Sequence, residues 1–383
     1  MGIIMKKNFL DLIYTKIKKY IIGVDKLLIF LLISLSIFSI YMIDSAAKSV
    51  LRERSVTIQT IGLILGIIMM IIISKIDYDI LSDLSPFLVA FSSIALIVTI
   101  FLATNKNGNY NWIEIGPINV QTSEFTKIAF AITFSTHLFK IKEKLNNIVN
   151  VLLLIVHFLL YFIPVVLQRD IGSALVYVFM FIVMLFVAGI YYRYLVMGVL
   201  LVAGISPIIW QNMKIYQKSR ILFALQPELD PLKYGFQPLQ SRMALGSGQF
   251  SGLGYGKGIQ TQNELLPESH TDFIFAIIGE EFGFVGCLIV LTVLTVIIIL
   301  IIRNAYKSKN ETGYYICFGI AAMIMFQMLI NVGMCIGLSP VIGITLPFVS
   351  YGGSSILSLY IAIGIVMSVR MKPEKKLKFK IEE

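Results

Sequence analysis

Ionisable side chains are concentrated in one short stretch, ELLPESHTDFIFAIIGEEFGF (264–284). Its polar front part contains Glu264, Glu268, His270 and Asp272, and the apolar run behind it contains Glu280 and Glu281. Carboxylates and histidine are the side chains that most often act as general acids and bases. Ionisable groups inside an apolar helix are costly and usually face a cavity or a partner charge. The stretch is therefore a candidate reaction site at the start of an apolar helix.

The spacing in this stretch indicates which residues would act together. On a helix, one small and polar face would carry Asp272, Ala276, Gly279, Glu280 and Gly283. Glu280 would then lie about 12 Å below Asp272, at a rise of about 1.5 Å per residue. Two structural alternatives stay open. Asp272 could be the N-cap of the helix, and Glu280 and Glu281 could form salt bridges between helices.

A second group of candidates precedes it in the chain. Glu124 and Lys127 are three residues apart and share a helix face, so they can form an ion pair, and the same pair can also line a cavity. Trp112 lies in the loop just before them. It is either an anchor at the membrane interface or a platform for a sugar ring or lipid tail.

The long polar segment 213–271 is rich in basic residues and glycine. Its cations are Lys214, Lys218, Arg220, Lys233, Arg242 and Lys257. Arginine and lysine match an anionic partner such as a diphosphate, and Arg220, Arg242 and Lys127 are the candidates to bind it. The glycines do not predict a nucleotide site, because GKG (256–258) lacks the Ser or Thr of a P-loop and no strand–turn–helix surrounds it.

Other site classes find no support in the sequence. No His, Cys and carboxylate grouping has transition-metal spacing, and the three cysteines all lie in apolar segments. The net charge of +10 is better explained by basic cytoplasmic loops of a membrane protein than by a nucleic-acid partner.

Composition predicts the elements that must position these residues. The chain is 57% hydrophobic and only 14% charged, and its mean hydropathy is +0.84. These values are typical of an all-α polytopic membrane protein. About ten apolar segments approach the length that a bilayer requires. They lie near 27–43, 57–76, 86–103, 121–139, 148–167, 170–190, 193–212, 272–302, 313–337 and 344–369.

The distribution of Lys and Arg predicts the orientation. Basic residues gather before the first span, after the last one, and in alternate loops such as KIKEK (140–144) and RNAYKSK (303–309). The positive-inside rule then places both termini in the cytoplasm. DYDILSDLS (77–85) and KSVLRER (48–54) fit this orientation poorly. The predicted organisation is a cytoplasmic segment 1–26, spans one to seven (27–212), a large extracytoplasmic loop (213–271), spans eight to ten (272–369) and a basic cytoplasmic tail (370–383).

Five motifs together resemble the SEDS family of shape, elongation, division and sporulation proteins, whose members include RodA, FtsW and SpoVE. They are NWIEIGPINVQTSEFTK, QRDIGSALV, YGFQPLQSRMALGSG, LPESHTDFIFAIIGEE and LPFVSYGGSS, in this order over nearly the whole chain. The stretch GKGIQTQNELLPESHTDF is most similar to the elongation branch. The chain departs from the family pattern at Asn111, Thr122 and Arg169, and Arg169 adds a charge that could pair with Asp170.

The resemblance implies an inverting peptidoglycan glycosyltransferase in the bacterial cytoplasmic membrane, with its active site facing outward. Such enzymes polymerise lipid II, a disaccharide-pentapeptide on undecaprenyl diphosphate, beside a class B penicillin-binding protein and other wall-synthesis proteins. The resemblance implies that Asp272 is catalytic, and that Trp112, Glu124 and Lys127 belong to the family's motifs. We expect Arg220, Arg242, His270 and Glu280 to help bind substrate.

The expected chemistry needs few groups. The donor already carries a diphosphate leaving group, so a base for the acceptor hydroxyl and positive charge for the diphosphate are sufficient. Asp272 would be that base, or would hold a divalent cation; no other cofactor is predicted. A lipid II flippase, a division or sporulation polymerase, and a scaffold for wall-synthesis enzymes are the alternatives.

Overall fold

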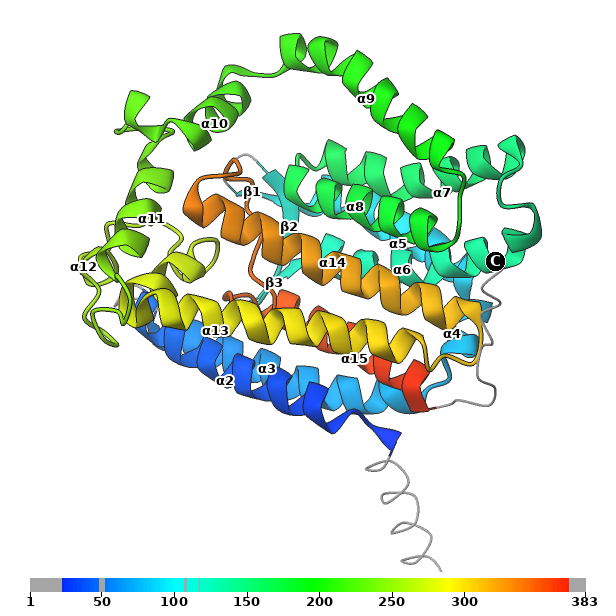
Figure 1. Cartoon of the computed structure of the whole chain (residues 1–383), viewed down its shortest axis with the longest axis horizontal. Coiled ribbons are helices and arrows are strands. Elements are labelled where there is room, and N and C mark those ends of the chain that lie inside the picture. Colours follow the sequence, from blue (N-terminus) through cyan, green and yellow to red (C-terminus); the bar gives the residue numbers. More distant parts are fainter. Residues whose placement is uncertain (1–22, 48–51, 107–108, 117, 372–383) are drawn as a thin grey trace, which may run out of the picture.

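The protein is a helical bundle with one small sheet (Figure 1). A computed structural model describes residues 23–47, 52–106, 109–116 and 118–371. Its long helices are α2 (Lys26–Ala46), α3 (Arg52–Lys75), α5 (Ser85–Leu102), α6 (Thr122–Ile141), α7 (Ile148–Leu167), α8 (Ile171–Val187), α9 (Tyr192–Asn212), α13 (Ile274–Ala305), α14 (Glu311–Ile336) and α15 (Gly353–Met371). Each overlaps one predicted apolar segment, which confirms the predicted class of all-α polytopic membrane protein.

Length and composition qualify most of these helices as membrane spans. Among the described residues, eight helices are long and apolar enough to cross a bilayer. The remaining two long helices are α8, which has 17 residues, and α6, which carries Glu124 and Lys127. The predicted number of about ten spans and the cytoplasmic location of the termini therefore stay predictions. Most of the basic residues in 1–26 and 370–383, and the start of 48–54, lie outside the described residues.

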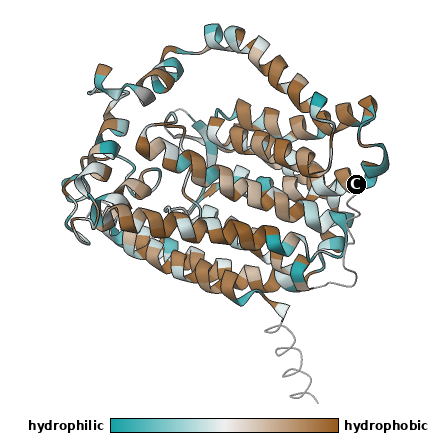
Figure 2. Cartoon of the chain, viewed as in Figure 1, coloured by the Kyte–Doolittle hydropathy of each residue, from teal (hydrophilic) through white to brown (hydrophobic). Residues whose placement is uncertain are grey.

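The outer surface of the bundle is that of a protein immersed in lipid. Large apolar side chains on α5 are exposed, among them Phe87, Phe91 and Ile94, each at 60% or more. Figure 2 shows hydrophobic residues along the lengths of the helices and hydrophilic residues mainly toward their ends and in the connections. Exposed apolar residues in such number are unfavourable in water, so lipid must cover this belt.

The interior is built around α14. It packs against α13, α8 and α6, while α3 and α15 make the most extensive helix pair. This last pair approaches closely because Gly66 lies against Tyr360, where an added Cβ would come within 3.1 Å of the tyrosine. At one end of the bundle, Asp25 accepts from Arg303 at 2.7 Å and from Arg370 at 2.8 Å, which ties α2, α13 and α15 together.

The segment 104–121, predicted as a loop, forms a three-stranded antiparallel sheet. Its strands are β1 (Thr104–Lys106), β2 (Asn109–Ile115) and β3 (Ile118–Gln121), in the order β1-β2-β3. Trp112 pairs with Gln121 across β2 and β3. Aromatic and β-branched residues in NYNWIEI favour a strand, and β3 begins three residues after β2 ends.

The predicted loop 213–271 contains several short elements. They are α10 (Ile215–Leu225), the 3-10 turn η2 (Pro227–Leu229), α11 (Phe236–Ser247) and α12 (Ile259–Gln262). Two more short elements, α4 (Tyr78–Asp83) and the 3-10 turn η1 (Lys142–Lys144), lie between long helices. Helices α9 and α10 arch away from the bundle in Figure 1, and none of the described residues of α9 is buried.

Candidate active site

Asp272 is held by its backbone, which leaves its carboxylate available. The helix α13 is preceded by Phe273, not Asp272, and has no side-chain cap, so the N-cap interpretation of Asp272 is wrong. Asn331 of α14 donates one hydrogen bond to the Asp272 carbonyl at 2.8 Å and another to the Ile344 carbonyl at 2.7 Å. Within the described part of the chain, no group donates a hydrogen bond to the Asp272 carboxylate. The site thus presents a fixed but unengaged carboxylate.

Burial and two neighbouring charges shift the pKa of this carboxyl group. Burial raises the pKa of Asp272 to about 7, the negative charge of Glu268 adds to this, and the positive charge of Arg220 opposes it. A carboxyl with a pKa near the working pH can both take and return a proton. Gly343, in the connection between α14 and α15, lies beside it: a Cβ there would be 3.7 Å from Asp272 Oδ2.

A small basic pocket adjoins this region. Its volume is about 90 Å³, and its lining combines Arg220 of α10 with Lys233, Tyr234, Gln237, Pro238 and Val341. Arg220 is common to the pocket and to the charges that act on Asp272. Two cations and two polar side chains around a concave surface are suited to phosphate oxygens, which favour charge-assisted hydrogen bonds.

Arg242 lies in a different position from Arg220. Its guanidinium donates to the Ala224 carbonyl at 2.8 Å and to the Gly337 carbonyl at 3.2 Å, and it approaches Glu228 at 3.6 Å. These contacts brace α11 against the end of α10 and the end of α14. Because two carbonyls already engage it, Arg242 supports the elements around the basic pocket. Its expected contact with substrate stays a prediction.

Glu280 and Glu281 hold the glycine-rich segment onto α13. Glu280 Oε1 accepts from the Gln260 amide at 2.7 Å, and its Oε2 accepts from the Thr261 amide at 3.1 Å and the Thr261 hydroxyl at 2.6 Å. Glu281 accepts from the Gly256 amide at 3.1 Å and from the Ser45 hydroxyl. Neither carboxylate forms a salt bridge with any of the described residues, so the alternative of interhelical salt bridges is wrong within this part of the chain. Glu280 is fully buried among these donors, away from any described pocket.

Two glycines explain why this docking is possible. Gly283 has φ 66° and ψ −162°, which breaks the helix at the last member of the predicted polar face, and Asp272, the first member, lies before the helix begins. Gly248, at the end of α11, lies directly against α13: a Cβ there would be 1.8 Å from the Gly279 carbonyl oxygen. The segment after α11 can then donate its backbone amides to Glu280 and Glu281.

Glu124 and Lys127 form the expected ion pair. Lys127 Nζ lies 2.6 Å from Glu124 Oε1, and both side chains are almost completely buried. Ser358 of α15 donates to Glu124 Oε2 at 3.4 Å. The pair lies in the first turns of α6, immediately after the sheet that carries the half-buried Trp112. No described contact joins these three residues directly to Asp272.

Asp170 organises this second group, and its importance was missed in the sequence. Its Oδ2 accepts from Asn111 at 2.8 Å, from Gln121 at 2.9 Å and from Ser123 at 3.3 Å. Its Oδ1 caps α8 by accepting from the Ser173 amide at 3.0 Å. The available signal was the QRDIG motif (168–172), in which the sequence suggested only that Arg169 could pair with Asp170.

Arg169 does not form that pair. Its backbone adopts φ 62°, and its guanidinium lies over the Tyr110 ring at 5.3 Å. The Arg169 side chain therefore contacts β2, while Asp170 accepts from the amides of Asn111 and Gln121 in the sheet and from the Ser123 hydroxyl. Both neighbours fasten the sheet to the start of α8, each through a different interaction.

His270 connects the Asp272 turn to the connection that precedes α15. Its carbonyl accepts from the Tyr351 amide at 2.9 Å, and the two rings lie 5.2 Å apart between centroids. The segment 337–352 thereby contacts the Asp272 turn directly through Tyr351, and Asn331 links the turn to the same segment by donating to the Asp272 and Ile344 carbonyls. His270 is close to Asp272 in the chain and shapes its turn.

Known proteins match the chain over almost its entire length. Residues 23–375 match the sequence profile of the FtsW/RodA/SpoVE cell cycle proteins. The chain belongs to this family, also called SEDS. It is 32% identical over 371 residues to the peptidoglycan glycosyltransferase MrdB of Escherichia coli K12, covering 95% of each chain. It is 34% identical over 357 residues to the probable peptidoglycan glycosyltransferase FtsW of Wigglesworthia glossinidia brevipalpis, covering 90% of this chain and 92% of that one.

Solved structures share the fold of this SEDS protein. A chain from a peptidoglycan synthase complex that coordinates polymerization and crosslinking superposes with a TM-score of 0.80, at 27% identity, and covers 91% of this chain and 97% of that one. RodA of Thermus thermophilus superposes with a TM-score of 0.70, at 24% identity, over 92% and 98% of the two chains. This SEDS protein is thus a multi-pass membrane protein with the RodA fold.

Proposed function

We propose that this SEDS protein is a peptidoglycan glycosyltransferase that polymerises lipid II for cell elongation. The observation that carries the proposal is the Asp272 carboxylate, which lacks hydrogen-bond donors among the described residues, has a pKa of about 7 and shares Arg220 with a basic pocket. A free base beside a phosphate-sized cationic pocket is what glycosyl transfer from a diphosphate requires. The relatives named as peptidoglycan glycosyltransferases support the same activity.

In the proposed reaction Asp272 takes the proton from a hydroxyl of the acceptor sugar. The acceptor oxygen attacks the anomeric carbon of the donor from the side opposite the diphosphate, with inversion at that carbon. The bond between the anomeric carbon and the diphosphate oxygen breaks, and the departing diphosphate keeps the electron pair. Arg220 and Lys233, which line the basic pocket, stabilise the charge that develops there.

A divalent cation is the alternative role for the same carboxylate. Mg²⁺ commonly binds through one or two carboxylates plus substrate phosphates and keeps several waters. The Glu268 charge acts on Asp272, so the two carboxylates are close enough to supply these ligands. Among the described residues, no group of three or more His, Cys, Asp and Glu side chains could hold a metal on its own. The residues therefore fit a cation held jointly with the substrate diphosphate.

The proposed setting is the outer face of the bacterial cytoplasmic membrane. Asp272 lies just before α13 and the sheet lies just before α6, at the end of the bundle that also carries the basic pocket. The basic helix connections near Arg303 and Lys142 lie at the other end. The positive-inside rule supports an outward active site, with 213–271 as an extracytoplasmic segment. The solved synthase complex supports a class B penicillin-binding protein as the partner that crosslinks the product.

A lipid II flippase would need polar groups through the full membrane depth. Glu280, inside the apolar run, instead uses both oxygens to hold the Gln260–Thr261 backbone. The test supplies labelled lipid II to the purified protein in liposomes, with and without the partner transpeptidase. We expect long glycan chains. A folded complex that moves lipid II across the bilayer without polymerising it would replace this proposal with transport.

A further inference from the structure

A second basic pocket lies at the end of the bundle remote from Asp272. Its volume is about 510 Å³, and Lys140, Lys142 and Lys144 line it together with Phe139, Asn150 and one acidic residue, Glu143. Lys142 also pairs with Glu311, the first residue of α14, at 3.1 Å. Because α14 runs antiparallel to α13, its first residue lies far from the Asp272 turn. The proposed active site does not include this pocket.

The charges in this pocket are available to an anion. Lys142 is shared between Glu311 and the Phe139 ring, over which its Nζ lies at 5.3 Å. Lys140 and Lys144 are exposed, and neither forms an ion pair among the described residues. The pocket therefore keeps two uncommitted ammonium groups near one carboxylate.

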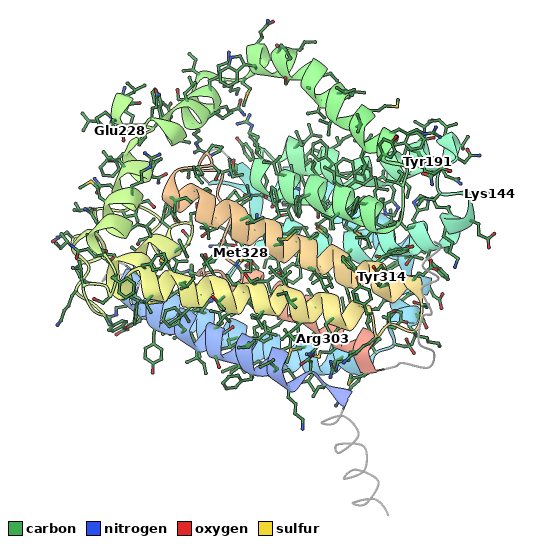
Figure 3. The ribbon with its side chains drawn as sticks, viewed as in Figure 1. Lys144, Tyr191, Glu228, Arg303, Tyr314 and Met328 are labelled. Atoms are coloured by element: carbon green, nitrogen blue, oxygen red, sulfur yellow. The ribbon has the colours of Figure 1, made fainter. Side chains whose placement is uncertain are left out.

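Neighbouring residues have the composition of a membrane interface. Asn146 accepts from the Tyr191 amide at 2.7 Å, and its carbonyl accepts from the Tyr194 hydroxyl at 3.0 Å. Arg193 lies over both tyrosine rings, at 4.8 and 5.2 Å. Tyrosine and arginine in such clusters are typical of the membrane interface. Figure 3 shows Lys144 and Tyr191 at the same edge of the molecule.

A surface for acyl chains begins directly beside the pocket. Helix α7 starts at Ile148, and its exposed apolar side chains continue along the bundle from there. They are Ile148, Val149, Leu152, Leu153 and Val156, with exposed fractions between 48% and 59%. Asn150, in the first turn of the same helix, lines the pocket. An amphiphile could place its charged group among the lysines and its tails along α7.

We propose that this pocket, the Lys140–Lys144 pocket, binds the phosphate headgroup of an anionic phospholipid of the adjoining leaflet. Basic pockets beside transmembrane helices on the cytoplasmic side suit such headgroups, and each lysine near the surface contributes appreciably to the attraction. The uncommitted ammonium groups supply the charge, the tyrosine cluster fixes the depth, and α7 accommodates the tails. A soluble phosphate would use the ammonium groups but not the apolar surface.

The test measures lipid retention by native mass spectrometry of the delipidated, intact protein. The protein is exposed to equal amounts of phosphatidylglycerol and phosphatidylcholine, and the variant Lys140→Gln/Lys144→Gln is compared with the wild type. We expect the wild type to prefer phosphatidylglycerol and the variant to bind it about 30-fold more weakly. The matched control is Lys26→Gln/Lys309→Gln, which removes two lysines from the same end of the bundle and should keep the preference.

Three outcomes would overturn the proposal. One is a wild type with no preference for phosphatidylglycerol, and another is an equal loss in the control variant. The third is displacement of the lipid by millimolar inorganic phosphate, which would identify a soluble anion as the occupant. All three are independent of lipid II polymerisation, so they leave the proposed glycosyltransferase function untouched.

Discussion

At the scale of single residues, the protonation of Asp272 should control the rate. Its pKa of about 7 means that the carboxyl is protonated, and unable to accept a proton, in acid. The polymerisation rate should therefore fall about tenfold per pH unit below that value and level off above it. The measurement is kcat/KM for lipid II across the neutral range. A flat profile between pH 5.5 and 8.5 would contradict the base role.

Glu268 offers a matched check of this assignment. Its negative charge raises the pKa of Asp272, so Glu268→Gln should move the midpoint of the pH profile to lower pH. A substitution that only loosened the turn would lower the rate at every pH without moving the midpoint. The direction of the shift therefore separates an electrostatic effect from a structural one.

The buried pair of Glu124 and Lys127 makes a different prediction, about stability. Lys127→Met leaves the Glu124 carboxylate buried without its counter-charge, which should cost about 3–5 kcal/mol of unfolding free energy. The double variant Glu124→Gln/Lys127→Met removes both charges and should recover most of the loss. Thermal unfolding of the three proteins in one detergent measures this. Equal stability of the single variant and the wild type would show that the pair is solvated.

At the scale of elements, the contact between α11 and α13 depends on Gly248. Gly248→Ala would place a Cβ at 1.8 Å from the Gly279 carbonyl oxygen, so the segment that Glu280 and Glu281 hold should detach. Limited proteolysis within 249–262 should become faster, and polymerisation should drop. Gly246→Ala, two residues earlier on the same helix, meets nothing within 4 Å and is the control. Similar proteolysis of both variants would contradict the account.

The sheet should depend on Asp170 in the same way. Asp170→Ala removes the acceptor of three side chains and the cap of α8, and the cap alone is worth about 1 kcal/mol. We expect lower stability and a more exposed Trp112. In a Trp210→Phe background Trp112 is the remaining tryptophan, and its emission should shift to the red. Unchanged emission would show that other contacts hold the sheet.

The sheet also shows what the sequence could not predict at this scale. The donors Asn111 and Ser123 lie 59 and 47 residues before Asp170, so local pattern alone does not reveal their common acceptor. The break at Gly283 was hidden for a similar reason. A glycine in an apolar run is compatible with a continuous helix. The break at Gly283 is explained only by the segment 249–252, which follows α11 and lies directly against this glycine through Phe250 and Gly252.

At the scale of the whole molecule, the sequence was a much better guide. A bilayer demands about 20 apolar residues for each span, so the apolar segments located nearly every long helix within a few residues. The exception is α15, which begins at Gly353 instead of 344. The residues between 344 and 353 do not form a helix there. Instead, the Leu346 amide donates to the Ser350 hydroxyl at 2.8 Å, and the Tyr351 amide donates to the His270 carbonyl.

The complete structure also distinguishes two kinds of candidate residue. Asp272 and Arg220 face a common region beside the basic pocket, whereas Glu280, Arg242 and Asp170 hold the surrounding elements in place. The sequence pattern marked residues of both kinds as candidates and did not tell their two roles apart. The distinction needs the partners of each side chain, which come from distant parts of the chain.

The most direct measurement compares lipid II polymerisation by the wild type, Asp272→Asn and Asp272→Ala in complex with the partner transpeptidase. Asparagine keeps the size of the side chain but cannot take a proton. We predict long glycan chains from the wild type and at least a hundredfold loss in both variants, at unchanged thermal stability and unchanged binding of lipid II. Substantial polymerisation by a folded Asp272→Asn protein would contradict the role of this carboxylate.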